Sequence, residues 1–169
     1  VERWNTLDLT INYAGFLRKY FPELHEINEK LNSSFGERVE HNTIKLTYRY
    51  ARKKNVLFDY VELVFSNFSK KPLYFYIKSK QEGSNIIDVV TKKYGKSTTV
   101  HWVDEKGKSL YWEDRRSILI ISIHEDRFGD PEYHTMIYYV PNLEELLSRE
   151  RQQREQTEEE IKKTGKTAF

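Results

Sequence analysis

The stretch that decides the fold is residues 84–140, which read SNIIDVVTKKYGKSTTVHWVDEKGKSLYWEDRRSILIISIHEDRFGDPEYHTMIYYV. Residues 84–94 carry apolar side chains at helical spacing, with Ser84 in an N-cap position and Gly95 just past the helix end. The remainder alternates strand-forming runs with polar turns, which predicts strands at 98–103, 109–112, 117–123 and 133–140. The stretch therefore predicts a helix followed by an antiparallel meander.

The same order of elements occurs earlier in the chain. Apolar residues between 13 and 35 recur at steps of three and four and end at Phe35-Gly36, and strand-like runs follow to about residue 79. We therefore predict an α+β domain over residues 1–147, made of two tandem helix–meander units at 12–80 and 84–147. Their antiparallel strands are expected to form one continuous sheet or two abutting sheets, with the helices on one face.

A charged helix is predicted at the C-terminus. Leu143, Leu146 and Leu147 form its apolar face, and the stripe is lost beyond Leu147. Glu and Arg or Lys residues then recur four positions apart, a spacing that supports a helix in water. Residues 148–169 are therefore interpreted as a charged helix and tail, either solvated or serving as a docking arm for a partner or a second copy.

The composition limits the classes of function. Of the 169 residues, 28 are basic and 26 acidic, and this balance argues against a general nucleic-acid binder. Cysteine is absent, which excludes disulfides and thiolate chemistry. No apolar run approaches the roughly 18 residues of a membrane-spanning helix. The chain begins at Val1, which fits either a cleaved signal peptide or a start chosen inside a longer protein.

The strongest concentration of chemically able side chains lies in the segment from His124 to His134. Pairing of the flanking strands would bring these histidines together at the base of the loop, with Asp126, Asp130 and Glu132 nearby. Imidazole and carboxylate suit zinc, so His124, Asp130 and His134 are weak metal candidates. Because a loop rich in Gly, Asp and Pro is also typical of a hairpin turn, the favoured interpretation is a solvated loop with no metal or cofactor.

Nothing in the sequence indicates catalysis. There is no Gly-x-Ser-x-Gly elbow, no Gly-rich phosphate loop and no Ser or Asp positioned to partner a histidine. Glu113 and Asp114 lie beside Arg115 and Arg116, which is typical of a charged turn. The chain is therefore not expected to be an enzyme.

Basic residues gather around the first hairpin, at Arg49, Arg52, Lys53 and Lys54. Interleaved tyrosines would give stacking platforms for a single-stranded nucleic acid. The favoured explanation is that lysines protect sheet edges against aggregation.

Aromatic residues are more numerous in the strands than one small core accommodates. The candidates for a protein-binding surface are Trp102, Tyr111, Trp112, Tyr138 and Tyr139. Alternation places Tyr111 and Trp112, and likewise Tyr138 and Tyr139, on opposite faces. The alternative is that these rings pair across strands and only stabilise the sheet.

The second unit resembles a known pattern through Lys93-Tyr94-Gly95-Lys96, Trp102, the strand at 117–123, and Ile137-Tyr138-Tyr139 before Leu143. It is similar to small exported bacterial proteins and lipoproteins of unknown function, and to the helix-plus-meander repeat of the β-lactamase-inhibitor-protein-like fold. The resemblance covers about residues 84–147; the first unit is similar only in architecture and has no Trp in its strands. It implies a binding or assembly role in the cell envelope and carries no catalytic residue.

The favoured hypothesis is a non-enzymatic module of the periplasm or cell envelope that binds another protein. The binding surface would be the aromatic sheet face or the charged C-terminal helix. The alternative is a cytoplasmic, nucleic-acid-associated module that uses the basic first hairpin.

Overall fold

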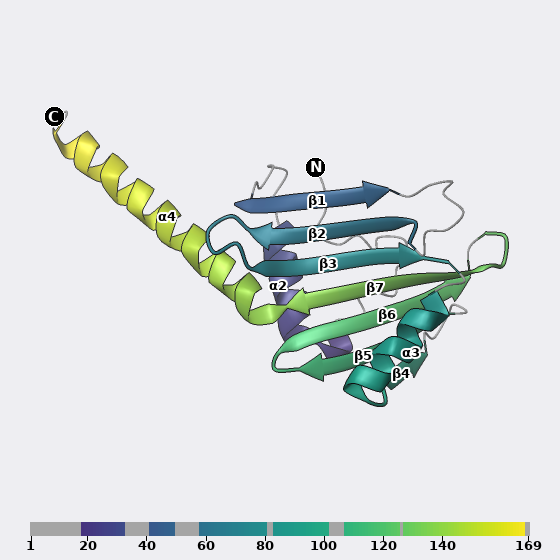
Figure 1. Cartoon of the computed structure of the whole chain (residues 1–169). Helices are drawn as coiled ribbons and strands as arrows, with labels where there is room; N and C mark the ends of the chain where they lie inside the picture. The colour runs from purple at the N-terminus through teal and green to yellow at the C-terminus, as the bar shows by residue number, and fades with distance from the viewer. Residues whose placement is uncertain are drawn as a thin grey trace.

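A computed structural model describes residues 18–32, 41–49, 58–80, 83–101, 107–125 and 127–167. In these residues seven antiparallel strands form one sheet in the order β1-β2-β3-β7-β6-β5-β4 (Figure 1). The strands are β1 (Thr43–Arg49), β2 (Tyr60–Ser66), β3 (Pro72–Ser79), β4 (Thr98–His101), β5 (Lys108–Asp114), β6 (Ser117–Glu125) and β7 (Pro131–Tyr139). The helices are α2 (Pro22–Asn32), α3 (Gly83–Tyr94) and α4 (Val140–Thr167). The predicted α+β fold with an antiparallel sheet is confirmed.

The two meanders join into one continuous sheet through the pairing of β3 with β7. Tyr74 lies opposite Tyr138 and Ser79 opposite Tyr133, so the last strand of the second unit pairs with the last strand of the first. The β4 strand thus lies at the far edge from β1. The chain must cross the sheet between β3 and β4, and α3 lies in this crossover.

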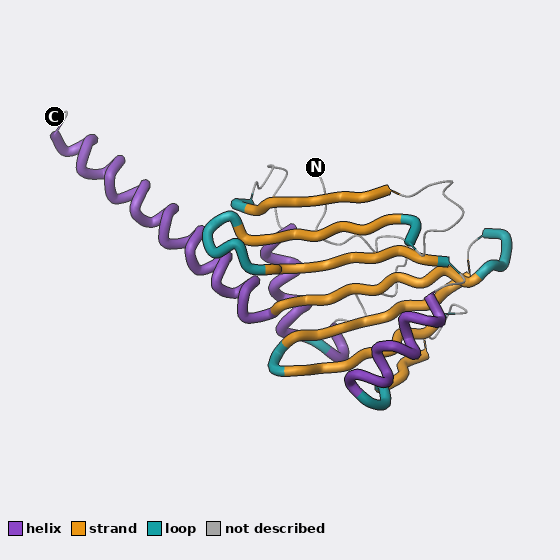
Figure 2. The backbone as a smooth tube through the Cα atoms, in the orientation of Figure 1, coloured by secondary structure: helices purple, strands orange, loops and turns teal. Residues whose placement is uncertain are grey.

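Helices cover both faces of the sheet, which corrects the expectation that they lie on one. We call the two sides the α2 face and the α3 face. Ile118 and Ile120 of β6 belong to a core with α2, whereas Ile121 packs in a second core with Val90 of α3. Figure 2 shows α3 in front of the sheet and α2 behind it. The cause is the run of consecutive apolar residues in β6, because neighbouring side chains point to opposite faces and each face then needs a cover.

The larger core lies between the α2 face, α2 and the start of α4. Leu24 of α2 and Leu143 and Leu146 of α4 are each 1% exposed and belong to the same cluster as Tyr74 and Tyr138 of the sheet. Burying an aliphatic side chain of this size contributes about 1.5–3 kcal/mol of transfer free energy. These contacts fix the two helices on one end of the sheet.

The long helix α4 changes character along its length. Its first turns are buried through Val140, Leu143 and Leu146, whereas residues 151–165 are exposed. Figure 1 shows this second part projecting away from the sheet. A charged C-terminal helix is therefore present as predicted. None of the helices in the described ranges is long and apolar enough to cross a membrane.

Candidate functional site

One half of the α3 face carries apolar side chains that are not packed in either core cluster. They belong to β1, β2, β3 and β7: Ile44, Leu46, Tyr48, Val61, Leu63, Phe65, Phe75, Ile77, Ile137 and Tyr139. We call this set the open patch. The three residues of β1 are the most exposed, with Ile44 at 37%, Leu46 at 43% and Tyr48 at 45%. The other members are half-buried.

Strand alternation builds the open patch. On β1, the residues between the apolar positions are Lys45 and Thr47, which face the other side opposite Val64 and Glu62. Across the sheet, Phe65, Phe75 and Tyr139 form a ladder of rings with centroid separations of 5.6 and 5.4 Å. Such cross-strand pairs stabilise a sheet and also hold the rings at fixed positions. The open patch is therefore an apolar surface whose aromatic rings pack across neighbouring strands.

The open patch continues the surface that α3 covers. Over the other half of the α3 face, Ile86, Ile87 and Val90 of α3 pack with Trp112 and Ile121. Tyr94 lies at the end of α3, near Tyr139 of the open patch. Burial raises the pKa of Tyr139, and the neighbouring Tyr94 raises it further. The half of the α3 face that lies under α3 and the open patch thus form one continuous apolar surface, and α3 packs on only part of it.

The predicted aromatic candidates divide between core and surface. Tyr138 is 1% exposed and Trp112 is 6% exposed, so neither ring is presented to a partner in this structure. Trp112 also donates its indole N–H to the carbonyl oxygen of Gly95 at 2.9 Å, which ties the end of α3 to β5. Tyr111 is half-buried and packs edge-on against Phe21, the residue just before α2, with the ring centroids 4.8 Å apart. Of the five candidates, Tyr139 belongs to the open patch, and Trp102 lies outside the described residues.

The basic candidates are mostly not described. Arg49 lies at the end of β1 with its guanidinium over the ring of Tyr60, 5.6 Å from the centroid. Arg52, Lys53 and Lys54 fall outside the described residues.

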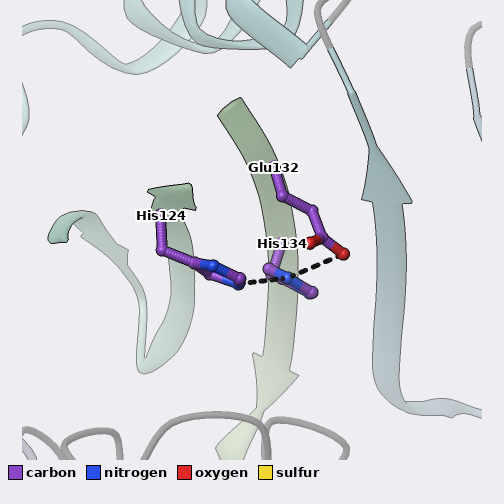
Figure 3. Close-up of side chains that lie close together, drawn as sticks. All are labelled: His124, Glu132 and His134. Atoms are coloured by element: carbon purple, nitrogen blue, oxygen red, sulfur yellow. Dashed lines mark hydrogen bonds and ion pairs between the residues drawn. The ribbon is translucent and has the colours of Figure 1, made fainter. Parts of the chain in front are cut away.

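A second candidate site, a cluster of polar side chains, lies on the α2 face at the end of the sheet away from the start of α4. His124 of β6 and His134 of β7 come together with Nε2 atoms 2.9 Å apart (Figure 3). The second ring nitrogen of His134 is 2.6 Å from the hydroxyl of Tyr76, and that of His124 is 3.0 Å from the carbonyl oxygen of Glu125. The hairpin brings the two histidines together as expected from the sequence. Asp130 is exposed in the loop and does not belong to the cluster of donor atoms.

If both rings are in the neutral form, one proton arrangement satisfies the three ring-nitrogen contacts described above. A carbonyl oxygen only accepts, so His124 Nδ1 donates to Glu125 and its Nε2 accepts from His134. Nδ1 of His134 then accepts from the Tyr76 hydroxyl. Burial lowers the pKa of His134 to about 4, with His124 and Lys78 adding to the shift and Glu132 opposing it. The ring of His134 is therefore neutral at pH 7.

Glu132 completes the cluster. Glu132 is 8% exposed, and its Oε1 lies 3.6 Å from Nε2 of His134. The same oxygen forms an ion pair with the ammonium group of Lys78 at 2.7 Å. Burial opposes its ionisation, but the hydrogen bond from Lys78 and the positive charge of Lys78 hold the pKa of Glu132 below its usual range. Burial, together with Glu132 and Glu62, raises the pKa of Tyr76. The cluster thus holds a buried carboxylate beside the neutral imidazole of His134.

A cleft of about 580 Å³ lies between α2 and α4. Its walls carry Glu23, Glu26, Glu144 and Glu150 along with Arg151 and Arg154. Glu150 binds Nδ1 of His41 at 2.9 Å. The lining of the cleft therefore combines negatively and positively charged side chains.

Sequence reasoning did not select Ile44, Leu46, Tyr76 or Lys78 for either site. The alternation in β1 was visible, but which of its faces meets solvent depends on the strand order.

Comparisons of the chain with protein-family models, with curated proteins and with solved structures found no match.

Proposed function

We propose that this protein is a non-enzymatic binding module whose open patch receives an amphipathic helix of another protein. The observation that carries the proposal is the exposure of Ile44, Leu46 and Tyr48 on a sheet face whose other half is covered by α3. Apolar side chains gathered on one surface are typical of protein interaction sites. An incoming helix would complete the layer that α3 begins.

The neighbouring charges define the partner further. Lys70, Lys71 and Lys80 are exposed and flank β3 at its two ends. A helix that places acidic residues beside its apolar stripe would meet these ammonium groups at the rim, where charge complementarity favours encounter and orientation. The proposed occupant is therefore an amphipathic, acidic helix.

We also place the protein in the cell envelope. The support is the resemblance of residues 84–147 to small exported bacterial proteins together with the absence of cysteine. Subcellular fractionation of the native product tests this location: recovery with the envelope supports it, and recovery in the cytosol removes it.

The binding proposal is tested with a defined probe. The ¹⁵N-labelled protein is titrated with a synthetic helical peptide that carries a leucine stripe and a glutamate-rich opposite face, and amide shifts are recorded. Saturable shifts should concentrate on β1, β2, β3 and β7 and disappear in Leu46→Glu. A peptide of the same composition in scrambled order is the matched control.

Two results would overturn the proposal. One is an equal response to the scrambled peptide. The other is a set of shifts concentrated on α4 or the cleft and unaffected by Leu46→Glu. Sedimentation without peptide identifies self-association, and a dimer that Leu46→Glu dissociates would assign the open patch to a second copy instead.

A further inference from the structure

The base of the β6–β7 hairpin gathers three side chains that can bind a metal ion. His124 lies opposite Glu132 in the strand pairing, and His134 follows on the same face two residues later. One donor atom from each of the three lies within 4.8 Å of the other two, and Figure 3 shows the two rings and the carboxylate converging. We propose that His124, Glu132 and His134 form a binding site for a divalent ion of the zinc class.

The donor set and its spacing fit this ion. Two imidazole nitrogens and one carboxylate oxygen are a known three-residue ligand set for zinc, which leaves a fourth position for water or another donor. Two ligands on a tetrahedral ion, each bonded at about 2.0–2.1 Å, lie roughly 3.3 Å apart. The separations here are 2.9 Å between the two Nε2 atoms and 3.6 Å between His134 Nε2 and Glu132 Oε1. The three donor atoms lie within 4.8 Å of one another, so binding an ion requires the ring pair to open by a few tenths of an ångström and the Glu132 carboxylate to turn toward the ion.

The surrounding contacts orient the ligands as a metal site requires. Ligating histidines normally donate their other N–H to a carbonyl or a neighbouring side chain, which fixes the ring and its tautomer. His124 Nδ1 already faces the carbonyl of Glu125 at 3.0 Å. For His134 to bind an ion through Nε2, its proton moves to Nδ1, from where it is donated to the hydroxyl oxygen of Tyr76 at 2.6 Å. Oε1 of Glu132, the oxygen 3.6 Å from His134 Nε2, also pairs with the ammonium of Lys78 at 2.7 Å. The carboxylate would therefore share Oε1 between Lys78 and the ion, or turn its second oxygen toward the ion.

Burial selects the type of ion. His134 is 0% exposed and Glu132 8%, whereas His124 is half-buried, so an ion enters past the His124 ring. An ion held there must give up most of its water. Magnesium loses water reluctantly and prefers oxygen ligands, whereas zinc binds imidazole nitrogen readily. The site should therefore take zinc and exclude magnesium.

The test uses the full chain after treatment with a chelator. Zinc is titrated in competition with a chromophoric chelator, and thermal unfolding is followed with and without zinc. We expect one zinc per chain at micromolar zinc, a higher melting temperature with zinc, and no response to magnesium. X-ray absorption of the zinc form should show only nitrogen and oxygen neighbours, two of them from imidazole.

Variants locate the site. Glu132→Gln keeps the side-chain shape and removes the anionic ligand, and His124→Gln removes an imidazole ligand at a half-buried position. Each should weaken zinc binding at least about tenfold. His101→Ala on β4 and Asp130→Asn in the loop are the matched controls and should bind like the wild type.

The proposal is overturned if the folded chain binds no zinc in the micromolar range. It is also overturned if His124→Gln and Glu132→Gln bind as tightly as the controls. The cluster lies on the α2 face and the open patch on the α3 face, so each proposal can fail without the other.

Discussion

Arg116, in the turn between β5 and β6, holds Glu144 of α4 with both ends of its guanidinium. Its Nη2 donates to Glu144 Oε1 at 2.6 Å and its Nη1 to Oε2 at 3.1 Å, and Nη2 also binds Glu23 of α2 at 2.6 Å. One side chain thus joins the sheet to both helices that cover the α2 face. Arg115 and Arg116 adopt positive φ values of 48° and 66°, which non-glycine residues rarely do. The turn keeps this backbone although the sequence supplies neither Gly nor Asn.

This arrangement predicts a pH-dependent contribution to stability. The hydrogen bond from Arg116 holds the pKa of Glu144 below its ordinary value of 4.5, although burial opposes the shift. A carboxyl group with a lower pKa in the folded state stabilises the fold above its unfolded pKa, and this contribution is lost as the pH falls through the folded pKa. The free energy of unfolding of the wild type should therefore exceed that of Glu144→Gln at pH 7, and the difference should vanish in acid.

Urea unfolding of the two proteins between pH 7 and pH 3 measures this difference. Added salt at pH 7 should also reduce it, because the pair is open to solvent. A difference that stays constant across the pH range would contradict the role of the ion pair.

Tyr138 and Tyr139 should respond very differently to truncation. Tyr138 is 1% exposed, and its ring lies 5.1 Å from that of Tyr74. Tyr138→Ala should lower the free energy of unfolding by about 3–5 kcal/mol, the usual cost of removing a buried aromatic ring. Tyr139→Ala removes a half-buried ring and should cost clearly less. Equal losses in denaturant titrations would refute the assignment of these neighbours to opposite faces.

The projecting part of α4 should be dispensable for folding. Residues 151–165 are exposed, and the last buried leucine, Leu146, lies before them. A chain ending after Glu150 keeps the ion pair of Glu150 with His41. Its melting temperature should fall by less than about 2 °C, since little buried surface is lost. A larger fall in calorimetry would show that the exposed helix stabilises the sheet.

The open patch should tolerate charge. Leu46 is 43% exposed on an edge strand, so Leu46→Glu should change the free energy of unfolding by less than about 0.5 kcal/mol. The same substitution should reduce the fluorescence of a dye that binds exposed apolar surface. The contrasting variant is Ile120→Glu. Ile120 is 0% exposed in the core on the α2 face, so this substitution should unfold the protein. Loss of the fold in Leu46→Glu would contradict the exposure of the patch.

Local patterns in the sequence predicted most elements of the fold. Alternation in the first strand and the Tyr94-Gly95 helix end correspond to β1 and α3, and Gly95 has the positive φ of +88° that suits this position. The continuous apolar run at 117–123 indicated that both faces of the sheet are covered. The prediction of helices on one face did not take this run into account. Sheet order was not accessible, because no local pattern specifies that β3 pairs with β7.

The sites show the same limit. Pairing within one hairpin is local, and it brings His124 and His134 together. Tyr76 reaches His134 across 58 residues of sequence, and Lys78 reaches Glu132 through the same β3–β7 pairing. The open patch likewise depends on which half of the α3 face lies under α3. Prediction of either site from the sequence therefore required knowledge of the strand order.

The most direct test of the binding proposal is site-specific photo-crosslinking in the native host. A photo-reactive amino acid is placed at position 46 in the open patch, or at position 161, where the native Ile161 is 65% exposed on α4. Our account predicts an adduct at position 46 with another protein, through an amphipathic acidic helix of that protein, and its loss when Leu63→Glu is added. An adduct formed equally at position 161, or one that joins two copies of this chain, would contradict it.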